Sequence, residues 1–123
     1  MYDKTLLREK LEQIRESVER INRRFKGIEV PLDFMATDAN HDKLDAIAMM
    51  LIAIGESFKK IDKETDSLFL KNYPDIDWKG VIGVRNILAH DYFDIDVEVI
   101  YKICQRDMPQ LIKTLEQMRE AVQ

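Results

Sequence analysis

The sequence predicts an all-α fold, an up-down bundle of four to five helices joined by short loops. Two observations predict this class: apolar residues recur at steps of three and four along several segments, and no segment shows a convincing alternation of period two. The composition agrees, because only 4 Gly and 3 Pro occur in 123 residues, which leaves little chain for turns or linkers. We expect one domain over residues 1–123.

The first two helices are predicted by the same apolar rhythm. In the first, the apolar residues step by 4, 3, 4, 3 and 4, and Gly27 is placed to end the helix. The second is predicted from about His41 to beyond Ile61, with Asp38 or Asn40 as its N-cap. Two small residues of the second helix, Ala48 and Gly55, would let another backbone approach closely. The apolar positions are Leu7, Leu11, Ile14, Val18, Ile21 and Phe25, then Leu44, Ile47, Leu51, Ile54, Phe58 and Ile61.

The second half is predicted from its caps and prolines. A short helical piece and a turn at Tyr73-Pro74 precede a third helix, which starts at Trp78 with Asp77 as N-cap and loosens near His90. The next helix is predicted from Val97 to about Gln105, with Asp96 as its cap, and restarts at Asp107-Met108-Pro109 because proline is tolerated in a first turn. Its final apolar stripe is Leu111, Leu115, Met118 and Val122.

Several other side chains are predicted to be structural. Trp78 and Tyr73 are expected to pack, and His41 is expected to be a surface or capping residue with no further role. Asp45 and Glu56 lie eleven residues apart on one helical face, but no sequence feature supports paired-carboxylate catalysis there. Five methionines lie among apolar positions and are predicted to be core: Met35, Met49, Met50, Met108 and Met118.

Charge and cysteine content limit the class of partner. A net charge of -4 and a pI near 5.2 argue against a broad nucleic-acid-binding surface, while leaving room for a local phosphate site. The longest apolar run, residues 46–54, is too short to cross a bilayer, and the charged amino end has no signal core. One cysteine, Cys104, allows no internal disulfide. We therefore expect a cytoplasmic protein that uses no membrane, cofactor or metal.

The segment "VRNILAHDYFDID", residues 84–96, departs from ordinary amphipathic helix. Arg85 and Tyr92 are two turns apart and share a face, whereas His90 lies on another face unless the helix unwinds after Leu88 or Ala89. In metal-free RNA cleavage the 2′-hydroxyl attacks the phosphorus, a histidine moves a proton and an arginine stabilises the phosphate charge. One histidine is too few to be both acid and base, but a two-fold dimer would supply two. The structural alternative is an arginine that anchors a helix end and a histidine that caps it.

Arg85, His90 and Tyr92 form the pattern R-x4-H-x-Y, and "RNILAHDYF" resembles the signature of HEPN domains of the HepT type. "HDKLDAIAMMLIAIGESFKKI" resembles that family's second helix with its Gly-Glu. "YPDIDWKGVIGVRN" resembles its lead-in to the motif, and "DIDVEVIYKICQRDMPQLIKTLEQM" resembles its ending with Asp-x-Pro. Where the family often has glycine before the tyrosine, this chain has Asp91, which adds negative charge.

The resemblance implies a HEPN-like bundle that forms a homodimer and acts as the toxin of a toxin–antitoxin pair, a metal-independent endoribonuclease acting on RNA, including tRNA. It implies that Arg85 and His90 are the catalytic pair, that Asn86 orients them, and that a minimal nucleotidyltransferase antitoxin silences the toxin by transferring AMP to Tyr92. The bulky, charged AMP would fill the cleft and repel phosphate. Two alternatives stay open: a non-catalytic adaptor that docks a nucleotidyltransferase and binds or presents its substrate, and a purely structural dimer.

Overall fold

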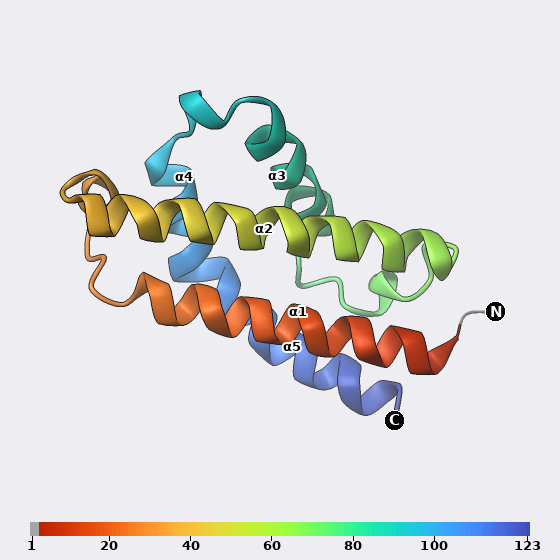
Figure 1. Cartoon of the computed structure of the whole chain (residues 1–123). Helices are drawn as coiled ribbons and strands as arrows, with labels where there is room; N and C mark the ends of the chain where they lie inside the picture. The colour runs from red at the N-terminus through yellow and green to blue at the C-terminus, as the bar shows by residue number, and fades with distance from the viewer. Residues whose placement is uncertain (1–2) are drawn as a thin grey trace.

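The computed structural model describes residues 3–123 and is built from helices (Figure 1). Five α-helices are formed by residues Lys4–Phe25 (α1), Asp38–Glu64 (α2), Trp78–His90 (α3), Val97–Lys102 (α4) and Met108–Ala121 (α5). Short 3-10 turns cover Pro31–Met35 (η1), Leu70–Asn72 (η2) and Tyr92–Asp94 (η3), and a π-helical turn, Ile103–Asp107 (η4), joins α4 to α5. No strand occurs among the described residues, so the predicted all-α, HEPN-like class is confirmed.

The core lies between α1, α2 and α5. Helices α1 and α2 run antiparallel side by side, α5 packs on α1, and α3 packs on the other side of α2 (Figure 1). Five of the six positions predicted for α1, from Leu7 to Ile21, are buried, and the sixth, Phe25, is partly buried against the core. The predicted positions of α2 and of the final stripe are buried too. The 3/4 rhythm therefore marked the buried faces correctly. No helix among residues 3–123 is both long and apolar enough to cross a membrane.

The start of α2 differs from the prediction. Thr37, not Asp38 or Asn40, is the N-cap: its hydroxyl accepts a hydrogen bond from the Asn40 backbone N–H at 3.0 Å, and the helix begins at Asp38, before His41. The Asn40 side chain is used elsewhere, because its amide donates to the Asp33 carbonyl at 2.9 Å. Asp38 instead occupies the first turn, where the helix dipole favours negative charge.

Two of the five methionines were placed wrongly. Met35 and Met49 are 52% and 62% exposed, whereas Met50 is partly buried against the core and Met108 and Met118 are buried. Met49 lies one turn after Asp45 and points to the exposed side of α2. The apolar character of a methionine does not by itself say on which side of a helix it lies.

Candidate functional site

The site begins with a firmly anchored α3. The Asp77 side chain caps the helix by accepting a hydrogen bond from the Gly80 backbone N–H at 3.0 Å, as predicted. Trp78 packs at a tilt against Phe58 of α2 with ring centroids 4.7 Å apart, and its indole N–H donates to the Tyr73 carbonyl at 2.9 Å. The Tyr73 ring packs on Phe69 with centroids 5.6 Å apart, so the packing role predicted for both aromatics is confirmed. The contacts of Trp78 fix the register of α3 on α2.

Gly55 lets α2 and α3 approach at the level of Arg85. A Cβ atom placed on Gly55 would lie 2.9 Å from the Arg85 Cβ and 3.1 Å from the Val81 carbonyl oxygen. Real Cβ atoms essentially never show the first distance and rarely the second, so a larger residue here would force the two helices to shift. The close approach predicted for Gly55 is confirmed, and it sets the Arg85 side chain directly beside α2.

Arg85 is held by an acidic residue of α2. Its Nε lies 2.8 Å from Oε2 of Glu56 in an ion pair, and its Nη1 donates to Oδ1 of Asn86 at 2.8 Å. Within residues 3–123 its Nη2 makes no hydrogen bond. Arg85 is therefore held through Nε and Nη1, from one side of its guanidinium. Sequence reasoning missed the role of Glu56, although Gly55-Glu56 was part of the family resemblance.

His90 does not lie on the same side of α3 as Arg85. Helix α3 continues to His90 without unwinding at Leu88 or Ala89, and the Asp91 N–H bonds the Ile87 carbonyl at 2.9 Å. Five residues on an unbroken helix separate two side chains by roughly 140° around the axis. His90 shares a face with Ile87, and both are exposed. One chain therefore presents Arg85 and His90 in different directions.

Tyr92, which begins turn η3, is tied to α2 at a second point. Its hydroxyl donates a hydrogen bond to Oδ1 of Asp45, and Nε2 of His41 lies 3.9 Å from the same oxygen. His41 is exposed, as predicted, but sequence reasoning missed this contact. Phe93 packs on Tyr92 with centroids 6.2 Å apart and is itself 100% exposed. Asp45 and Glu56, which share one face of α2, thus each contact one motif residue of α3–η3.

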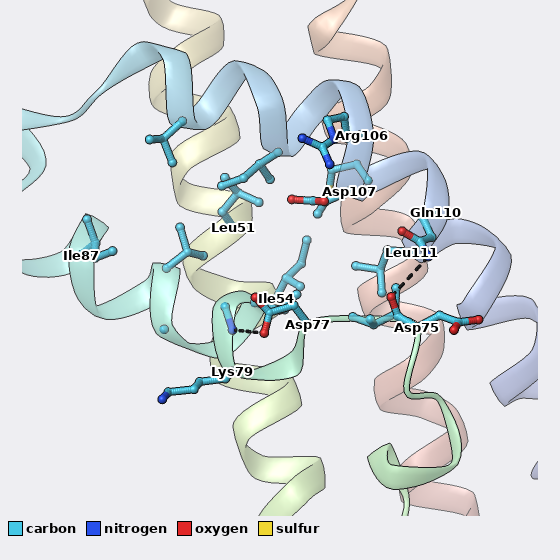
Figure 2. A pocket seen from close by; sticks show the side chains of 18 residues that line it. Leu51, Ile54, Asp75, Asp77, Lys79, Ile87, Arg106, Asp107, Gln110 and Leu111 are labelled. Atoms are coloured by element: carbon cyan, nitrogen blue, oxygen red, sulfur yellow. Dashed lines mark hydrogen bonds between the residues drawn. The ribbon is translucent and has the colours of Figure 1, made fainter.

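A groove opens on the other side of α3, toward α4 and α5 (Figure 2). Its volume is about 740 Å³, and Ile54, Ile87 and Leu111 are among its apolar lining residues. Burial raises the pKa of the Asp107 carboxyl at its edge, Arg106 opposes that shift, and Asp77 adds to it. Neither Arg85 nor Tyr92 lines the groove. Arg85 and Tyr92 therefore lie apart from this groove, whereas His90 follows Ile87 on the face that borders it.

Cys104, the one cysteine, is buried and is not suited to act as a nucleophile. Burial raises the pKa of its thiol to about 12, so the thiolate is essentially absent at neutral pH. The thiol is a packing residue of the core.

Comparison with known proteins identifies the family to which the sequence is similar. Residues 7–118 match the model of the family described as "Ribonuclease HepT-like". Over 71 residues the chain is 37% identical to a Methanocaldococcus jannaschii protein named "Putative RNase", an overlap of 58% of this chain and 62% of that protein. It is 33% identical over 75 residues to the "Probable ribonuclease HepT" of Thermococcus cleftensis, an overlap of 61% and 64%.

A longer overlap occurs with a Caldanaerobacter subterraneus protein also named "Putative RNase", with 29% identity over 108 residues, 88% of this chain and 89% of that protein. The overlap with the first two relatives is less than two thirds of their own length. No solved structure matches the chain at a significant level. Because the family model spans most of the sequence and agrees with the helical frame, this chain belongs to the HepT-like ribonuclease family.

Proposed function

We propose that the chain is the toxin subunit of a HepT–nucleotidyltransferase toxin–antitoxin pair, a metal-independent endoribonuclease silenced by AMP transfer to Tyr92. The observation that carries the proposal is the placement of the motif. Arg85 is oriented by Glu56 yet keeps Nη2 for a ligand, and His90 stands exposed at the end of the same helix. The family membership supports RNA, including tRNA, as the substrate class.

The proposed chemistry needs no metal ion. The ribose 2′-hydroxyl attacks the adjacent phosphorus while the 5′-oxygen leaves, so the product carries a 2′,3′-cyclic phosphate. His90 moves the proton, and Arg85 stabilises the negative charge that develops on the phosphate oxygens. Asn86, which accepts a hydrogen bond from Arg85, keeps the guanidinium in place.

The proposed active form is a homodimer with a composite site. In one chain Arg85 faces α2 and His90 lies on another face of α3, which favours a site that takes the two groups from different subunits. An isologous interface would bring the same patch from both chains together and would supply a second histidine as the acid. Exposed Ile87 and Phe93, adjacent to the motif, are apolar surface of the kind that such an interface buries.

A second function is favoured by the local charge. Glu56 neutralises much of the charge of Arg85, and Asp45, Asp91 and Asp94 add negative charge around Tyr92. Such a surface disfavours RNA approach. The second candidate is therefore a non-catalytic adaptor subunit that docks a nucleotidyltransferase and binds or presents its substrate. The lone buried cysteine fits a cytoplasmic compartment under either function.

The experiment that separates them measures growth arrest and RNA cleavage by the wild type, His90→Ala and Arg85→Ala. Arg20→Ala, an exposed arginine of α1, is the matched control, and each variant is checked for folding and dimerisation. The nuclease proposal expects cleavage in the wild type and the control and its loss in both motif variants. Absence of cleavage by wild-type protein that intact mass shows to carry no AMP would favour the adaptor.

A further inference from the structure

We propose that Asp45 is a catalytic residue of the modification reaction: its carboxylate takes the phenolic proton of Tyr92 as the oxygen is adenylylated. The inference rests on the proposed AMP transfer and adds a residue of α2 to it. The observation is the hydrogen bond from the Tyr92 hydroxyl to Oδ1 of Asp45, which joins residues 47 positions apart in the sequence.

A neutral tyrosine hydroxyl is a weak nucleophile, so transfer of a group to it requires a base within hydrogen-bonding reach. Asp45 is the described residue that the Tyr92 hydroxyl contacts. Of the acidic residues that follow Tyr92, Asp96 is occupied as the cap of α4, where it accepts from the Glu98 N–H at 2.9 Å. Asp45 is therefore the carboxylate placed to accept the proton.

A purely structural role explains the contact less well. The Asp45 side chain is 53% exposed. A hydrogen bond at such an exposed position contributes only about 0.5–1.5 kcal/mol to the stability of the fold. The exposure instead leaves the Tyr92–Asp45 pair open to a second protein that carries a bound nucleotide. The adjacent Phe93, which is fully exposed, adds apolar surface for such a protein at the same point.

The nucleotidyltransferase binds ATP, and the Tyr92 Oη attacks the α-phosphorus. A bond forms between Oη and phosphorus, the bond from that phosphorus to the bridging oxygen breaks, and pyrophosphate leaves. The phenolic proton passes to the Asp45 carboxylate and then to water. Transfer also removes the hydrogen that Tyr92 donated to Asp45, so the product has lost this tie between η3 and α2.

The test uses Asp45→Asn, with Asp42→Asn as the matched control, because Asp42 is an exposed carboxylate of the same helix. Asparagine keeps an oxygen that can accept the hydrogen bond but cannot take the proton. The first measurement needs no partner: the rate at which Tyr92 reacts with an aryl sulfonyl fluoride, followed by peptide mass spectrometry against pH. We expect Asp45→Asn to slow this reaction about 10²–10⁴-fold and Asp42→Asn to leave it unchanged.

The second measurement is the rate of AMP transfer from ATP by the cognate nucleotidyltransferase, with Tyr92→Phe as the blank. We expect the same loss of AMP transfer in Asp45→Asn and none in Asp42→Asn. Reaction of Asp45→Asn with the sulfonyl fluoride at a rate within threefold of wild type would overturn the inference. An Asp45-dependent sulfonyl fluoride reaction without any AMP transfer to wild type would instead refute the proposed modification and leave the role of Asp45 as a base standing.

Discussion

Helices α1 and α3 use their apolar residues in different ways. Helix α1 buries five side chains in a regular stripe, and its exposed faces are charged. Helix α3 fully buries only Leu88, leaves Ile87 58% exposed, and carries the motif on its remaining faces. The two helices thus differ in how many apolar side chains they bury in the core and how many they leave on the surface. The dimer and the nucleotidyltransferase contact proposed above would both use this exposed surface of α3 and η3.

The sharpest test of that comparison replaces the same residue type in both helices. Ile14→Ala in α1 removes a side chain that is 2% exposed, and we expect a loss of about 2–5 kcal/mol in the free energy of unfolding because a cavity is left. Ile87→Ala in α3 should change it by less than about 0.5 kcal/mol and instead weaken self-association. Chemical denaturation of dilute protein and sedimentation measure the two effects. Equal destabilisation by both substitutions would break the comparison.

A glycine pair tests how tightly α3 is held on α2. Gly55→Ala forces a Cβ within 2.9 Å of the Arg85 Cβ, so we expect a loss of about 1–3 kcal/mol and reduced RNA cleavage as Arg85 shifts. Gly83→Ala is the control: no atom lies within 4 Å of its added Cβ, and alanine should stabilise the helix by about 0.5–1 kcal/mol. Thermal unfolding of the two variants measures these effects. A Gly55→Ala protein as stable and active as the wild type would refute the close contact between α2 and α3 at this residue.

The smallest effect is expected on the exposed face of α1. The hydrogen bond from Arg15 lowers the pKa of Glu12 below 4.5, and Arg119 adds a weaker attraction. A carboxyl whose pKa is lower in the folded state stabilises the fold above its unfolded pKa and loses that contribution as the pH falls. Glu12→Gln should therefore cost at most about 1 kcal/mol at pH 7 and nothing well below pH 4.5. Denaturation at pH 7 and at a pH well below 4.5 measures this cost. An equal cost at the two pH values would exclude the Glu12–Arg15 ion pair as its origin.

The fold was predictable where local patterns determine it. The 3/4 rhythm marked the buried faces of α1 and α2, and Asp77 and Asp96 were correctly identified as caps because capping depends on residues two or three positions away. The cap of α2 was missed because Thr37 competes with two neighbours of similar propensity. Met49 was misplaced because residue type does not reveal which side of α2 remains uncovered.

The site was only partly predictable. The sequence motif locates Arg85, His90 and Tyr92 along the chain, but the partners of Arg85 and Tyr92 come from α2. Glu56 lies 29 positions from Arg85 and Asp45 lies 47 from Tyr92. No local pattern encodes such pairings, because they depend on how α2 and α3 pack. Asp45 and Glu56 could have been noticed as two carboxylates on one face, but the groups they would contact could not.

The most direct test of the central claim identifies the ends of the RNA products. Wild-type protein without AMP is incubated with RNA in the presence of a chelator, and the fragments are analysed by mass spectrometry beside those from His90→Ala. The proposed mechanism predicts fragments that end in a 2′,3′-cyclic phosphate, formed without metal and absent with His90→Ala. Fragments with 5′-phosphate and 3′-hydroxyl ends, or cleavage that survives in His90→Ala, would contradict it.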